Sequence, residues 1–81
     1  MDRIIKAKLN NEIKEFNVLL TFTSKKDDKK YIVYTNFNDN KILFSHYRVE
    51  NDLYILTPVT NENEVQMCLD IIKTIMENKN N

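Results

Sequence analysis

Runs of hydrophobic residues recur along the first 57 residues, and some of them alternate with polar residues with the period of two that is typical of β-strands. The alternation is clearest where Phe16, Val18, Leu20 and Phe22 would share one face of a strand. Runs of this kind predict five strands, near residues 3–9, 12–24, 30–36, 41–50 and 53–57. Because the intervening segments have only two to five residues, neighbouring strands should be antiparallel and form a meander.

The pattern changes after Pro58, where hydrophobic residues begin to recur with the 3.6-residue period of an α-helix. One stripe of this helix would contain Val65, Cys68, Leu69, Ile72, Ile75 and Met76. Asn61, followed by Glu64 three residues later, resembles a helix-capping pair, and Thr60 is an alternative cap. The predicted fold class is therefore α+β: an antiparallel five-stranded β-meander with one C-terminal α-helix packed across one face.

Turns must form without glycine, which is absent from the chain. Tight hairpin turns usually need a residue with positive φ, and Asn and Asp tolerate this region better than other non-glycine residues. Such residues lie between the predicted strands, at Asn10-Asn11, Asp27-Asp28, Asn38-Asp39-Asn40 and Asn51-Asp52. We expect these four sites to be the turns of the meander.

Composition indicates a small protein of a reducing compartment. With 81 residues, we expect one domain over residues 1–77 and a frayed tail over 78–81. Cys68 is the only cysteine, which excludes an internal disulfide, and the sequence shows neither a leader nor a long apolar stretch. The expected location is the cytoplasm. Twelve basic and twelve acidic residues give zero net charge, which argues against a dedicated nucleic-acid-binding protein.

Two strand motifs resemble a known family. The segments Val18–Phe22 (VLLTF) and Tyr31–Thr35 (YIVYT) flank a charged turn, and Leu56–Val59 (LTPV) precedes the terminal helix. This arrangement resembles the small, uncharacterised YrzB-like family of Firmicutes, whose pattern is VLFTF, a charged turn, YVLYT and LEPI. The resemblance covers about residues 9–77. It implies a bacterial protein with a similar fold, and it supplies no catalytic residues.

The residues that could perform chemistry are few and poorly arranged for it. Ser45 and His46 are adjacent on a predicted strand, so their side chains should point to opposite faces and cannot act as nucleophile and base. Cys68 lies on the apolar stripe of the helix, where burial would raise the pKa of its thiol. One Cys and one His are too few for a transition-metal site, and without glycine no phosphate-binding loop can form. We therefore expect no enzyme activity, cofactor or metal.

The predicted sheet has more hydrophobic surface than one helix can cover. Apolar residues occupy both faces of the third, fourth and fifth strands. We assign to the face without the helix Leu19, Ile32, Tyr34, Leu43, Tyr47, Tyr54 and Leu56. Either the sheet curls and buries part of this set, or the set is a contact surface for a second copy or another protein. The leading hypothesis is a non-catalytic protein-interaction or regulatory module, such as an inhibitor or adaptor of a larger bacterial or phage machine.

The alternative hypothesis is an RNA-associated accessory protein. Tyr34, Tyr47 and Tyr54 would stack on bases, and phosphates would lie near the lysines of the KKDDKK segment, Lys25, Lys26, Lys29 and Lys30. Asp27 and Asp28 interrupt this basic run, so the preferred interpretation of the segment is a solvated hairpin turn. Partners are therefore expected to be proteins rather than nucleic acid or membrane.

Overall fold

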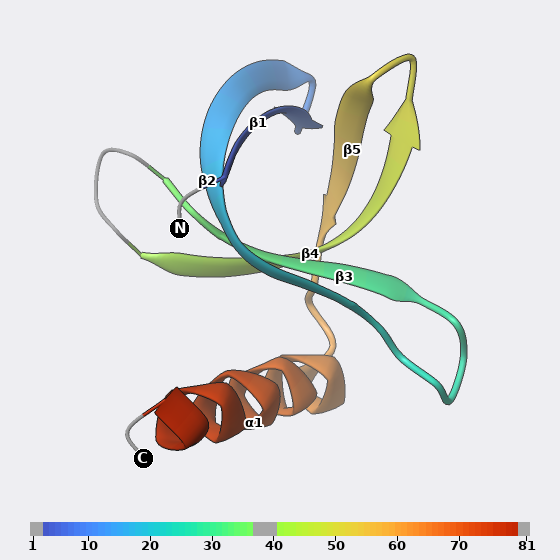
Figure 1. Ribbon diagram of the computed structural model, residues 1–81. Helices are drawn as coiled ribbons and strands as arrows, with labels where there is room; N and C mark the ends of the chain where they lie inside the picture. Colours follow the sequence, from blue (N-terminus) through green and yellow to red (C-terminus); the bar gives the residue numbers. More distant parts are fainter. Residues whose placement is uncertain (1–2, 37–40, 80–81) are drawn as a thin grey trace.

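The computed structural model describes residues 3–36 and 41–79, and within them it contains five strands and one helix. The elements are β1 (Arg3–Leu9), β2 (Glu12–Thr23), β3 (Lys30–Thr35), β4 (Ile42–Glu50), β5 (Leu53–Pro58) and α1 (Glu62–Lys79) (Figure 1). All five strands agree with the predicted ones to within a residue or two. The helix continues through Lys79, beyond the predicted start of the frayed tail at residue 78.

The sheet closes into a small barrel with strand order β1-β2-β3-β4-β5, and the prediction of an open meander was wrong in this respect. Successive strands are antiparallel, as expected. A meander of five strands can close only with a parallel pair, since the first and fifth strands run in the same direction. That pair joins β1 to β5 through Ala7 opposite Tyr54 and Lys8 opposite Ile55.

Closure depends on the shape of β2, the longest strand. Its first half, up to Val18, pairs with β1, and its second half, from Asn17, pairs with β3. The register with β3 shifts between Val18 and Leu20, which leaves Leu19 as an extra residue in a β-bulge. Because a bulge bends and twists its strand, β2 can serve both sides of the barrel, and its curvature is visible in Figure 1.

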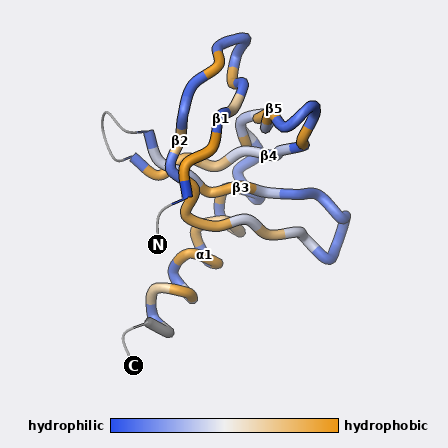
Figure 2. Tube along the Cα trace, turned by 45° about the horizontal axis from the view of Figure 1, so that its top comes forward, coloured by the Kyte–Doolittle hydropathy of each residue, from blue (hydrophilic) through white to orange (hydrophobic). Residues whose placement is uncertain are grey.

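Asn and Asp residues make the turns that the sequence predicted. Positive φ angles occur at Asn10 and Asn11, at Asp28, and at Asn51 and Asp52. Two consecutive residues with positive φ form the turn that fits the twist of a two-residue hairpin. The predicted turn at residues 38–40 lies outside the described residues. The described hairpin tips are hydrophilic (Figure 2), so the hydrophobic positions are concentrated towards the middle of the strands.

The barrel has two apolar faces, which are buried in different ways. Its interior is filled by a cluster that includes Ile5, Ala7, Phe16 and Val18. On the outer face, Tyr31 and Val33 of β3 are also buried. Helix α1 runs along the outside of the barrel, beneath β2, β3 and β4 in Figure 1, and the hydroxyl of Tyr31 bonds to its Glu64. The barrel therefore covers one face of the sheet by curvature, and the helix covers part of the other.

Candidate functional site

The seven residues predicted to form one exposed contact surface do not form it. Ile32, Tyr34 and Leu56 are buried in the barrel interior, and Leu43, Tyr47 and Tyr54 pack against them. Only Leu19, at the β2 bulge, is exposed, with 49% of its surface accessible. The physical reason is closure of the barrel, which turns this face of the sheet inward. The alternative in which a curled sheet buries these residues within one chain is the one that the structure shows.

The same closure removes the stacking surface of the RNA hypothesis. The ring of Tyr34 packs edge-on against Phe16, with centroids 4.9 Å apart, and only 2% of the residue is exposed. The rings of Tyr47 and Tyr54 pack against each other at 5.6 Å and contact the interior cluster. Tyr34 therefore fills the barrel interior, and Tyr47 and Tyr54 are partly buried against it and against each other.

The KKDDKK segment forms a turn that satisfies its own polar groups. The backbone N–H of Ser24 donates to the carbonyl of Lys29 at 2.9 Å, and that of Asp28 donates to the carbonyl of Ser24 at 2.8 Å. The Asp27 carboxylate accepts from the Lys29 N–H, which lowers its pKa. Lys25, Lys26 and Lys30 are exposed. The geometry agrees with the predicted solvated turn.

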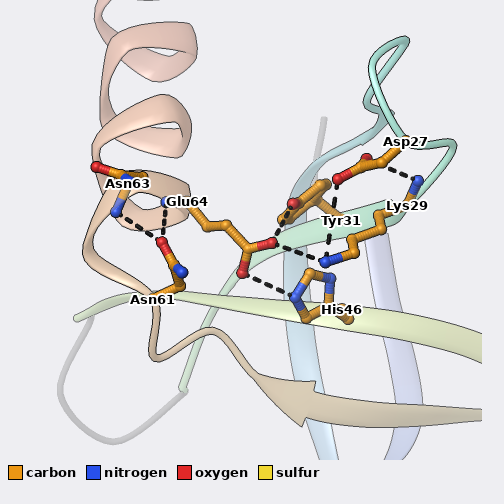
Figure 3. Close-up of polar contacts among 7 residues, drawn as sticks. All are labelled: Asp27, Lys29, Tyr31, His46, Asn61, Asn63 and Glu64. Atoms are coloured by element: carbon orange, nitrogen blue, oxygen red, sulfur yellow. Dashed lines mark hydrogen bonds and ion pairs between the residues drawn. The ribbon is translucent and has the colours of Figure 1, made fainter.

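Glu64 is the centre of a polar cluster between α1 and the barrel (Figure 3). Its Oε2 accepts from the Tyr31 hydroxyl at 2.9 Å and from Lys29 Nζ at 3.3 Å. Its Oε1 lies 3.2 Å from His46 Nε2. Tyr31 and His46 are paired across β3 and β4 on the outer face of the barrel, and their rings lie 4.6 Å apart. The cluster therefore attaches the first turn of the helix to two adjacent strands.

The capping of α1 explains why the Glu64 carboxylate is available to bond to the barrel. The Asn61 side chain caps the helix, accepting from the N–H groups of Asn63 at 2.8 Å and Glu64 at 3.2 Å. This confirms Asn61, rather than Thr60, as the cap. In a full capping box the Glu64 side chain would reach back to the Asn61 N–H. Here it extends to the barrel instead, so one residue joins the helix end to the sheet.

Electrostatics favour the charged form of Glu64. Its pKa lies below the ordinary value of 4.5, first because the Tyr31 hydroxyl donates to it and then because Lys29 and His46 also bond to it. The partner hydroxyl shifts the other way: burial, followed by the bond to Glu64, raises the pKa of Tyr31. A neutral phenol therefore donates to a carboxylate, which is the stronger class of hydrogen bond.

The cluster contains no nucleophile in a reactive setting. Ser45 faces the barrel interior, where its Oγ lies 2.7 Å from the Tyr34 hydroxyl, while His46 faces the helix, as the strand alternation predicted. Cys68 is fully buried, and burial raises the pKa of its thiol. Among the described residues, no three His, Cys, Asp or Glu side chains are grouped so that they could hold a metal ion. The geometry of the cluster suits attachment of the helix.

Removing the charge of Glu64 should make the stability of the protein less dependent on acid pH. Because the pKa of Glu64 is lowered in the folded state, its charge stabilises the fold above pH 4.5, and this contribution disappears as the pH falls through the folded-state value. We expect Glu64→Gln to melt at a lower temperature than the wild type at pH 7, with a difference that shrinks below pH 4.5. Thermal melts from pH 7 to pH 3 measure this, with Glu62→Gln as the control from the same helical turn. A difference that stays constant with pH would contradict it.

The uncovered surface of α1 is the second notable feature. At about 100° per residue, the apolar side chains of the helix cover roughly 200° of its circumference. These are Val65, Met67, Cys68, Leu69, Ile71, Ile72, Ile75 and Met76. Only Cys68 is fully buried, whereas Leu69 and Met76 are 47% and 60% exposed. An apolar stripe of about 100° is enough for a helix that packs on one neighbour, so this helix has apolar surface on both sides of its contact with the barrel.

One of these sides carries a shallow, open groove. A groove of about 490 Å³ runs along α1, lined by Asn63, Gln66, Met67, Asp70, Ile71, Thr74 and Ile75. All of its lining residues belong to the helix. Met67, Ile71 and Ile75, spaced four residues apart, form an apolar ridge along one edge, and we call them the α1 ridge. Figure 2 shows that hydrophobic positions recur along much of the helix. The ridge and groove form the candidate contact surface of this chain.

Sequence reasoning identified part of this surface. The predicted stripe included Ile75 but omitted Met67 and Ile71, because it followed a single face of the helix. A count of all apolar residues around the helix would have found both. No pattern in the sequence predicted the Glu64 cluster, because the cluster depends on which strand residues lie beneath the first turn of the helix.

Comparison with models of protein families, with curated proteins and with solved structures finds no match to this chain. The described part of the chain contains no helix long and apolar enough to cross a membrane. The similarity to the YrzB-like family therefore stays a prediction from the strand motifs.

Proposed function

We propose that the protein is a non-catalytic interaction module that binds another protein chain through the α1 ridge and groove. The observation that supports this most directly is the open groove along α1, whose apolar edge, Met67, Ile71 and Ile75, is only partly buried. Small soluble domains seldom leave a continuous apolar face open to water unless it has a partner. A groove beside an apolar ridge is also the usual way in which helices bind other helices.

The proposed class of function, a protein-interaction module, is the one expected from the sequence. The proposed contact surface differs, because it lies on α1 and not on the sheet. The sequence placed the contact on the sheet, but all of those residues except Leu19 lie in the barrel interior or pack against it. The barrel then has the role of a rigid support, and the Glu64 cluster fixes the start of the helix against it. With the resemblance to the YrzB-like family, the proposed setting is the bacterial cytoplasm, as an adaptor or inhibitor within a larger assembly.

The test is loss of binding when a charge is placed on the ridge. Tagged wild type and Ile71→Glu would be used to capture proteins from the native cell, and the retained proteins quantified by mass spectrometry. We expect the proteins retained by the wild type, including untagged copies of this chain, to fall at least about tenfold with the variant, because a buried carboxylate has no partner in an apolar contact.

The matched control is Ile13→Glu, which makes the same change at a residue of β2 that is 58% exposed. It should retain the same proteins as the wild type. Met67→Glu, at the N-terminal end of the ridge, is a second variant in case the first alters the fold, and circular dichroism checks that each variant stays folded. If both folded ridge variants retain the wild-type set, the proposal is wrong.

A further inference from the structure

We infer that α1 is a hinged arm, which opens from the barrel and closes again while the barrel stays folded, and that the Glu64 cluster is the latch that keeps it closed. In the open state, the part of the outer face that α1 now covers is exposed to solvent, including Tyr31 and Val33 of β3. This inference does not depend on the proposed function, because it concerns how α1 is attached and not which protein binds it.

The first argument is that the barrel and the helix are buried separately. Within the part of the chain that the structure describes, the interior cluster and the residues packed against it all belong to strands. The helix instead lies on the outer face, where Tyr31 and Val33 are buried. Opening of the helix therefore leaves the barrel interior filled. Segments that do not share a core with the rest of a protein can open at a lower free energy than the whole chain unfolds.

The second argument is that one residue makes the polar attachment of the helix. Among the described residues, each hydrogen bond that joins α1 to the barrel ends on the Glu64 carboxylate. Figure 3 shows this side chain extending from the first helical turn towards Tyr31, Lys29 and His46. Near the other end of the helix, Met76 is 60% exposed. A change at the Glu64 carboxylate should therefore loosen the whole helix.

The third argument is the connection between β5 and α1, which has a hinge at Thr60. On the barrel side, the Val59 N–H donates to the carbonyl of Phe44 on β4 at 3.2 Å. On the helix side, Asn61 caps α1, and its carbonyl accepts from the Val65 N–H at 3.0 Å. Thr60 lies between these two anchored residues and forms no hydrogen bond within the described residues. Rotation of the backbone at this one residue would move the capped helix as a unit.

The experiment uses Cys68, the only cysteine of the chain, as a probe of opening. Its thiol is fully buried one helical turn after Glu64, so a reagent reaches it only when the arm opens or the chain unfolds. The reagent is dithionitrobenzoate at slightly alkaline pH: the Cys68 thiolate attacks its disulfide, one mixed disulfide forms, and one coloured thionitrobenzoate leaves. Without urea, we expect labelling at least about tenfold faster than global unfolding allows, with a weaker dependence on urea, because opening exposes less surface.

Four variants distinguish opening of the arm from unfolding of the barrel. Glu64→Gln should accelerate labelling without urea about tenfold, because a neutral amide is a weaker acceptor than the carboxylate. Tyr31→Phe is a second latch variant, in case the first alters the fold, and should change the rate in the same direction. Glu62→Gln is the control from the same helical turn and should leave the rate unchanged. Ile32→Val, in the barrel interior, should lower the urea midpoint of unfolding without changing the rate in its absence.

Each contrary outcome removes a stated part of the inference. If Cys68 reacts no faster than global unfolding allows, in the wild type and in both latch variants, the arm does not open separately and the inference is wrong. If Ile32→Val accelerates labelling as much as it favours unfolding, opening requires the barrel core to unfold, and the inference is also wrong. If labelling is fast but neither Glu64→Gln nor Tyr31→Phe changes it, the hinged arm stands and the latch is wrong.

Discussion

Replacing Ile32 with alanine should lower the free energy of unfolding by about 3–4 kcal/mol, which is a large share of the stability of a domain of this size. Ile32 is fully buried in the barrel interior, and its neighbours there include Ile5, Phe16 and Leu56. Removal of its larger side chain leaves a cavity that the closed barrel cannot easily fill. Equilibrium unfolding in urea, followed by circular dichroism, measures the change.

Leu19→Ala is the matched control for this experiment. Both residues were assigned to the same sheet face from the sequence, yet Leu19 lies at the β2 bulge and is half exposed. Its replacement should change the free energy of unfolding by no more than about 0.5 kcal/mol. Equal, small effects at both positions would mean that Ile32 lies on an open face and that the barrel does not close.

The strands and turns could be predicted because their signals are local. Alternation within a run identifies a strand, and pairs such as Asn10-Asn11 and Asn51-Asp52 identify turns, which the positive φ angles confirm. Closure of the barrel could not be predicted from such local signals. It depends on pairing between Ala7 and Tyr54, which are far apart in the sequence, and on a bulge that no single residue reveals.

Apolar residues on both faces of the sheet correctly indicated that both faces are covered, but two structures can explain this pattern. An open sheet would need a partner on its second face, whereas a closed barrel buries that face by itself. Ser45 illustrates the difference, because a serine between apolar strand residues has no clear place in a flat sheet. In the barrel it lies inside, opposite Ile32, and bonds to Tyr34.

The candidate site could be predicted only in outline. The spacing of apolar residues predicted the helix and its apolar stripe. It did not predict where the helix packs on the barrel, because that depends on which side chains lie on the outer face of the closed sheet. Those residues include Tyr31, Val33 and His46, and two of them, Tyr31 and His46, fix the start of α1 through their bonds to Glu64. Exposed apolar residues remain on the barrel strands, such as Ile4 and Ile13, as well as on the helix. The proposed contact lies on α1 because an open groove runs along its apolar side chains.

The second large effect should come from the buried pair of hydroxyls formed by Tyr34 and Ser45. Their oxygens lie 2.7 Å apart in the barrel interior, and burial raises the pKa of Tyr34, so the phenol stays neutral. Tyr34→Phe leaves the Ser45 hydroxyl without its partner, and Ser45→Ala does the same to Tyr34. Each change should cost about 1–3 kcal/mol of unfolding free energy, since a buried polar group loses its hydrogen bond.

The double variant distinguishes a bonded pair from two independent residues. With both hydroxyls removed, no buried polar group is left unpaired, so Tyr34→Phe with Ser45→Ala should cost less than the sum of the single changes, by about 1–2 kcal/mol. Urea unfolding of all four proteins completes the cycle.

The result also bears on the RNA hypothesis, because a tyrosine that stacks on bases at the surface would tolerate replacement by phenylalanine without loss of stability. Additive costs would show that the two hydroxyls do not bond to each other, and a stable Tyr34→Phe variant would place this ring outside the barrel.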